Sequence, residues 1–252
     1  MAENKTNLKL DTLPGQIRDS MKDFAGKLTA ELGENLQSIT VVGSSLTADY
    51  RPGQSDINTV IVLSKQTTGL LKSIAHLAKP MRKKHISPPL LMTASYIERS
   101  LDVFGIEFLE FQSTHRTILG DDPFAALNIN KKDVRLQCER ELKAMLIRLR
   151  QGFIAAAANK KLVQDILIST AKGLLPLLRA MLWLKGIERT ALVEPTMTKA
   201  AEEFLIDMES LKTAIQWRQQ KTRLSEIEME SAFESIYATV EKLARIVDKL
   251  EV

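Results

Sequence analysis

Two short segments of the chain carry residues whose types and spacing suit phosphate and metal chemistry. An apolar run over residues 39–42 ends at Gly43-Ser44, and a second run begins at Asp56 and passes through Asn58. A Gly-Ser turn lets backbone N–H groups approach a phosphate closely, because glycine carries no side chain. Side chains alternate between the two faces of a strand, so Asp56 and Asn58 share one face. Carboxylate and amide oxygens bind Mg²⁺. The two segments therefore predict a site for a phosphate and its metal ion.

The patterning of the rest of the chain predicts the elements that hold this site. We expect strands over residues 38–43, 56–63, 90–93, 106–112 and 116–119, and helices over 13–32, 66–84 and 94–101. Long helices follow over 131–158 and 162–184, the second bent or opened at Pro176, then shorter helices over 197–215 and a last helix over 226–252. The predicted fold class is α+β, with a small mixed sheet in a first domain, residues 1–125, and an all-α helical bundle in a second, residues 126–252.

Composition limits the classes of partner. The 252 residues carry 35 basic and 31 acidic side chains, a net charge of +4. That balance is too mild to predict nucleic-acid binding, and it suits a small anionic ligand. The single cysteine, Cys138, cannot form an intramolecular disulfide, which favours a reducing compartment. The N-terminus has no apolar leader, and charged residues interrupt the apolar stretch 162–184, so we expect a cytoplasmic protein with no membrane span.

The Gly43-Ser44 turn, the Asp56 strand and the order of elements resemble the nucleotidyltransferase superfamily. The helical half is similar to the accessory bundle of two-domain members such as the aminoglycoside nucleotidyltransferases. The resemblance implies that the turn residues Gly43, Ser44 and Ser45 hold a nucleoside triphosphate and that Asp56 binds its Mg²⁺. Arg51, in the loop before Asp56, is either a further phosphate ligand or a solvated loop residue.

The family places a second acid where this chain has Asn58, and a third acid on a later strand. The resemblance thus implies a metal site of Asp56, Asn58 and either Glu107 or Glu110. In a strand over 106–112, Glu107 would share its face with apolar side chains, where a carboxylate needs a cation or a hydrogen-bond partner. This favours Glu107 as the third acid, and the catalytic residues are then Asp56 and Glu107.

Two functions follow from the resemblance. In the first, the protein transfers a nucleotidyl group from a Mg-nucleoside triphosphate to a hydroxyl of a small molecule or protein, bound in a cleft between the domains. In the second, the enzyme has decayed into a nucleotide-sensing or protein-interaction module, acting as a homodimer or with another protein. Asn58 favours the second function, because its neutral amide binds a metal ion less strongly than the carboxylate that the family has there. Each loss of about 1.4 kcal/mol of transition-state stabilisation lowers the rate tenfold.

Overall fold

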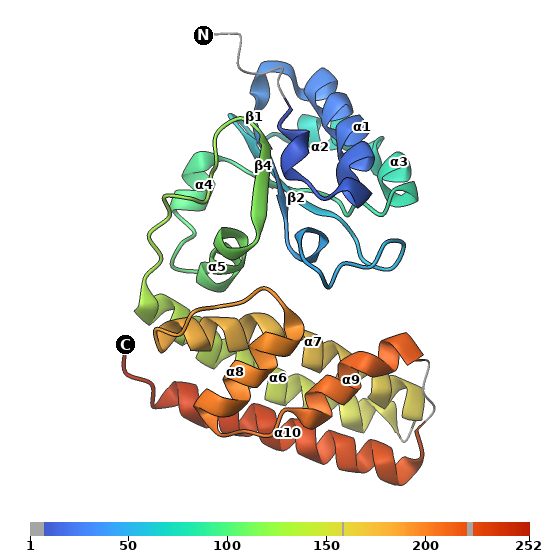
Figure 1. The fold of residues 1–252 in the computed structure, drawn as a ribbon, viewed down its shortest axis with the longest axis vertical. Helices are drawn as coiled ribbons and strands as arrows, with labels where there is room; N and C mark the ends of the chain where they lie inside the picture. The colour runs from blue at the N-terminus through green and yellow to red at the C-terminus, as the bar shows by residue number, and fades with distance from the viewer. Residues whose placement is uncertain (1–7, 158, 221–223) are drawn as a thin grey trace. The chain divides into compact units, whose positions relative to one another are not determined.

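The structure is a computed structural model that describes residues 8–157, 159–220 and 224–252 (Figure 1). It divides into two compact units. The first comprises Met1–Asp102 and Phe108–Asn128, and the second comprises Val103–Glu107 and Ile129–Val252.

The first unit is built on a four-stranded mixed sheet with the order β3-β2-β1-β4. Its strands are β1 (Leu36–Val42), β2 (Asn58–Leu63), β3 (Leu90–Met92) and β4 (His115–Leu119). Strand β1 is antiparallel to both β2 and β4, whereas β2 and β3 are parallel. As a result, the end of β1, the start of β2 and the start of β4 meet at one edge of the sheet. The small mixed sheet expected from the sequence is confirmed.

Helices cover both faces of this sheet (Figure 1). On one face lie α1 (Gly15–Leu32), α2 (Thr68–Ala75) and α3 (Ala78–Lys83), and on the other lie α4 (Ala94–Glu98) and α5 (Gly105–Ser113). The α1 side chains Met21 and Leu28 pack with Ile39 and Ile61 of the sheet in one apolar core. The single helix expected over 66–84 is two helices, the first of which begins where the Thr67 side chain accepts a hydrogen bond from Leu70 N–H.

The strand expected over residues 106–112 is wrong, because this segment is helix α5. Ile106, Phe108 and Leu109 are buried, a spacing that follows the turn of a helix and not the alternation of a strand. The Gln137 side chain accepts a hydrogen bond from Ile106 N–H at 2.9 Å and thereby satisfies one free donor of the first helical turn. A short apolar run does not by itself distinguish a buried strand from a buried helix.

The second unit consists mainly of helices. They are α6 (Lys131–Ala156), α7 (Lys160–Leu184), α8 (Val193–Phe204), α9 (Glu209–Gln220) and α10 (Glu226–Asp248). Residue 158, the end of the helix predicted over 131–158, lies outside the described residues. Helix α7 continues through Pro176. It is long and apolar enough to span a membrane by length and composition, with a mean hydropathy of 1.4, but 61% of that stretch is buried, as in the core helix of a bundle.

Buried Arg179 of α7 is held inside the second unit. Its guanidinium donates hydrogen bonds to the carbonyls of Thr190 and Ala191 at 3.0 and 2.8 Å. These two contacts join α7 to the segment that leads into α8.

Candidate functional site

The Gly43 turn follows directly from the end of β1. Gly43 has φ +81°, a conformation that residues with a side chain rarely adopt. Its N–H donates to the carbonyl of Thr114 at 3.0 Å, and its own carbonyl accepts from Leu46 N–H at 3.1 Å. The chain then makes one 3-10 turn over Ser44–Leu46. One hydrogen bond thus joins the turn to the segment before β4, and the other closes the turn itself.

Several polar groups of this turn have no partner. In the part of the chain that the structure describes, the backbone N–H groups of Ser44 and Ser45 donate no hydrogen bond. The Ser45 side chain is 1% exposed and its hydroxyl is likewise without a partner. Adjacent backbone N–H groups in a turn form a concavity that binds anions, and buried polar groups are seldom left unsatisfied. The turn therefore has the donors for a phosphate oxygen.

Asp56 and Asn58 lie beside the Gly43 turn. Asn58 pairs with Val42, the last residue of β1, and a Cβ atom built on Gly43 would be 3.8 Å from the Asn58 Nδ2 atom. Both Asp56 and Asn58 are exposed, whereas Ile57 between them is buried. Strand β2 begins at Asn58, so Asp56 precedes the strand, whereas the sequence had predicted that Asp56 starts it. The sheet brings the amide of Asn58 to the turn.

Tyr50 is a neighbour of Asp56 that sequence reasoning missed. Its side chain is half-buried in the loop between the turn and β2. Burial raises the pKa of the Tyr50 phenol, and the negative charge of Asp56 raises it further. The phenol is therefore close enough to sense the Asp56 charge. An isolated tyrosine in a polar loop carries no sequence signal that it lies near Asp56.

Arg51 lies in the same loop, and only its backbone is fixed. Its carbonyl accepts hydrogen bonds from Gln54 N–H at 3.1 Å and Ser55 N–H at 2.9 Å. Its side chain is exposed, and the guanidinium has no hydrogen bond or ion pair with the residues described. Arg51 as a phosphate ligand stays a prediction.

Glu107 does not have the surroundings expected for it. It lies in the first turn of α5, is exposed, and belongs to the second unit, where its carboxylate accepts a hydrogen bond from Gln137 Nε2 at 2.7 Å. The comparison with Glu110 by strand face does not apply, because both lie on a helix. Glu107 as the third acid therefore stays a prediction, without the strand geometry that favoured it over Glu110.

The donor set at the turn determines what kind of metal fits. Among residues 8–157, 159–220 and 224–252, no three His, Cys, Asp or Glu side chains come together in a way that could hold a metal ion. At the turn itself the protein offers the carboxylate of Asp56 and the amide oxygen of Asn58. Magnesium is commonly bound through one or two carboxylates together with substrate phosphates. The residues fit a Mg²⁺ ion that arrives with a triphosphate, not one held by protein ligands alone.

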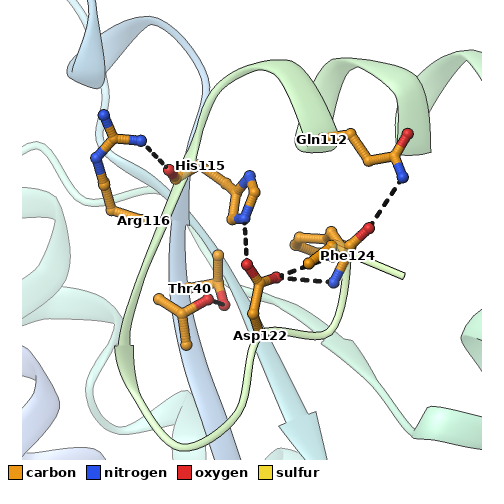
Figure 2. A network of polar contacts seen from close by, with 8 residues as sticks. Thr40, Gln112, His115, Arg116, Asp122 and Phe124 are labelled. Carbon is orange, nitrogen blue, oxygen red and sulfur yellow. Dashed lines mark hydrogen bonds and ion pairs between the residues drawn. The ribbon is translucent and has the colours of Figure 1, made fainter. Parts of the chain in front are cut away.

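A histidine–aspartate pair, also missed from the sequence, lies at the same edge of the sheet (Figure 2). His115, the first residue of β4, pairs with Val42 of β1, and its Nε2 atom is 2.7 Å from the Asp122 carboxylate. The ring stands edge-on to Phe124, with the centroids 5.7 Å apart. A single histidine at a strand start carries no sequence signal for such a pair.

Backbone groups fix Asp122 in place. Its Oδ1 atom accepts hydrogen bonds from the N–H groups of Phe124 at 2.9 Å and Ala125 at 3.3 Å. Burial opposes ionisation of this carboxyl, but the hydrogen bonds from His115 and from the two backbone groups outweigh it and lower the Asp122 pKa. Asp122 is therefore an ionised partner of His115. Gln112 joins the network by donating to the carbonyl of Phe124 at 3.0 Å (Figure 2).

The second unit has a groove of its own between α6 and α7, with a volume of about 570 Å³. This volume is within the range of sites for small organic molecules. The lining is mostly aliphatic or small, with a few charged and hydroxyl side chains. It consists of Met145, Arg148, Leu149, Gly152, Ala155, Ala156, Leu162, Asp165, Ile166, Ser169, Thr170 and Gly173.

Comparisons with known proteins identify the fold. No protein-family model matches the chain, and no curated protein matches it in sequence. Among solved structures, it is similar to the spectinomycin adenyltransferase AAD(9) from Enterococcus faecialis, determined with ATP and spectinomycin. The TM-score is 0.54 at 12% sequence identity, and the match covers 92% of this chain and 99% of that one. Similarity at this identity concerns the fold, and it agrees with the resemblance found in the sequence.

Proposed function

We propose that this chain, which has the fold of a two-part nucleotidyltransferase, binds a Mg-nucleoside triphosphate at the Gly43 turn and transfers its nucleotidyl group to an acceptor hydroxyl. The observation that carries the proposal is the turn itself. Two adjacent backbone N–H groups without partners lie at Ser44 and Ser45, next to Asp56 and Asn58. A nucleotide triphosphate with its Mg²⁺ complements this arrangement of donors and oxygen ligands.

Each residue has a distinct role in this proposal. The N–H groups of Ser44 and Ser45 bind phosphate oxygens, and the exposed Ser44 hydroxyl adds a third donor. Asp56 and Asn58 hold the Mg²⁺ that comes with the nucleotide, and this ion offsets the negative charge of the triphosphate. Because Asn58 is neutral, the protein places one negative charge beside the ion, where two carboxylates would place two.

For the acceptor we propose a small molecule that carries a free hydroxyl. The solved structure of similar fold is that of an adenyltransferase with spectinomycin. Spectinomycin is therefore the first acceptor to test.

Calorimetry tests the nucleotide site. ATP, GTP, CTP and UTP are titrated into the native chain with Mg²⁺ and with EDTA, and into Ser44→Ala and Asn58→Asp. We expect binding that requires Mg²⁺, is weakened in Ser44→Ala and is strengthened in Asn58→Asp. Absence of binding by both the native chain and Asn58→Asp would overturn the proposal.

Transfer is measured separately, with α-labelled ATP and each candidate acceptor. Labelled product from the native chain would establish an active enzyme. Labelled product from Asn58→Asp alone would instead identify a nucleotide-binding protein whose catalysis has decayed through residue 58.

A further inference from the structure

One row of paired residues connects the proposed nucleotide site to the His115–Asp122 pair. Asn58 and His115 both pair with Val42, from opposite sides of β1. Side chains of directly paired residues lie on the same face of a sheet, and neighbouring strands are about 4.8 Å apart, so the Asn58 and His115 Cα atoms are separated by roughly 10 Å. The carbonyl of Thr114, next to His115, accepts the hydrogen bond from Gly43 N–H. His115 therefore borders the turn on the face that carries Asn58.

The contacts of His115 leave one ring nitrogen available. An ionised carboxylate only accepts hydrogen bonds, so the Nε2 atom must carry the proton that is shared with Asp122. The Nδ1 atom then presents its lone pair, and it has no hydrogen-bond partner in the described ranges. The neighbouring Arg116 guanidinium donates to the backbone carbonyl of His115 at 2.7 Å. A carboxylate that accepts a hydrogen bond from one ring nitrogen fixes the tautomer and the orientation of an imidazole.

We propose that His115 is the proton acceptor for the acceptor hydroxyl, and that Asp122 is its positioning residue. This inference rests on the proposed function. The hydroxyl oxygen forms a bond to the α-phosphorus while the bond from that phosphorus to the bridging oxygen of the β-phosphate breaks, and pyrophosphate leaves. The hydroxyl proton passes to His115 Nδ1, and the Asp122 carboxylate stabilises the resulting imidazolium. The imidazolium then releases its proton to solvent.

Nuclear magnetic resonance tests whether His115 lies at the nucleotide site. The chain contains three histidines, at positions 76, 85 and 115. Ring signals of ¹⁵N-histidine-labelled protein are recorded with α,β-methylene-ATP and either Mg²⁺ or paramagnetic Mn²⁺. We expect Mn²⁺ to broaden the His115 signals and to spare His76, which follows α2 and lies 3.7 Å from Glu31 near the end of α1. The ¹⁵N shifts should show the proton on Nε2.

Calorimetry on the same samples separates the two proposals. If Mn-nucleotide binds and the His115 signals remain as sharp as those of His76, the role of His115 is overturned while the nucleotide site stands. If no nucleotide binds, the proposed function fails, and the role of His115 fails with it.

Kinetics then test the chemical role, in whichever of the native chain or Asn58→Asp catalyses transfer. His115→Asn should lower kcat about 10²- to 10⁴-fold, the usual contribution of a positioned acid or base, with the KM for ATP within about twofold. His76→Asn serves as the matched control and should retain full activity. In His115→Ala, added imidazole should restore part of the rate, which a purely structural role would not produce. A folded His115→Asn variant with an unchanged kcat would overturn the proposal.

Discussion

At the residue scale, two glycines with a similar positive φ allow the proposed nucleotide turn to be compared with an ordinary loop. Gly43 has φ +81° and Gly53 has φ +76°, and a Cβ atom would fit the available space at either position. A residue with a side chain at such a positive φ costs about 1–3 kcal/mol. Both substitutions should therefore lower the free energy of unfolding. Only Gly43→Ala should weaken Mg-ATP binding, by at least about tenfold, because the strain acts on the N–H groups of the turn.

Urea denaturation and calorimetry on the two variants check this prediction. Equal ATP affinities for Gly43→Ala and Gly53→Ala would show that the conformation of the turn does not matter for the nucleotide.

Asp122 gives a prediction of pH dependence. Its pKa is lowered in the folded state, so it binds protons less readily there than in the unfolded chain. The stabilisation that it contributes is therefore complete above its unfolded pKa and is lost as the pH falls through its folded pKa. In Asp122→Asn this contribution should disappear, so the free energy of unfolding should decrease less on acidification than in the native chain. Thermal denaturation between about pH 6 and pH 3 measures how the stability of each protein changes with pH. Equal changes in the two proteins would contradict a lowered pKa of Asp122 in the folded state.

At the element scale, the turn after β4 depends on a close approach of two chain segments. Gly120 has φ +73°, and a Cβ atom there would be 2.0 Å from the backbone carbonyl oxygen of Gln37. Gly120→Ala should therefore lower the free energy of unfolding by roughly 2–5 kcal/mol, since left-handed strain and overpacking add together. Gly53→Ala, with similar strain and open space, is the control. A Gly120→Ala variant as stable as Gly53→Ala would show that β1 moves aside at little cost.

Most elements could be predicted from apolar periodicity, and α5 could not. Strands β1 and β2 and helices α1, α6, α7 and α10 lie where apolar periodicity placed them. Helix α5 was misassigned because the short segment 106–112, with four apolar and three polar residues, fits either a strand or a helix, and contacts with α6, such as that of Gln137, decide between them. The error carried over to the third acid, since the argument for Glu107 used strand alternation.

At the scale of the whole molecule, Cys138 provides a probe of the second unit. Its side chain is buried in α6, and burial raises the pKa of its thiol to about 12. Only the thiolate reacts, so a thiol reagent such as DTNB should label the folded chain at pH 8 far more slowly than a chain unfolded in urea. The labelling rate across a urea titration should follow the helical signal of the second unit. Rapid labelling without urea would contradict the burial of this helix face.

The sequence alone determined the features that depend on neighbouring residues. Glycine at a left-handed position, two polar side chains on one strand face and helical stripes are all properties of local backbone geometry, and they predicted the Gly43 turn, the Asp56 and Asn58 strand and the α+β class. The tertiary structure decided which distant residues share the site. Sheet pairing, which depends on the packing of the entire first unit, places His115 beside Val42 and so brings the Asp122 pair to the Gly43 turn. No spacing between residues 42, 58 and 115 encodes that row, because the register between strands is set by the packing of their faces.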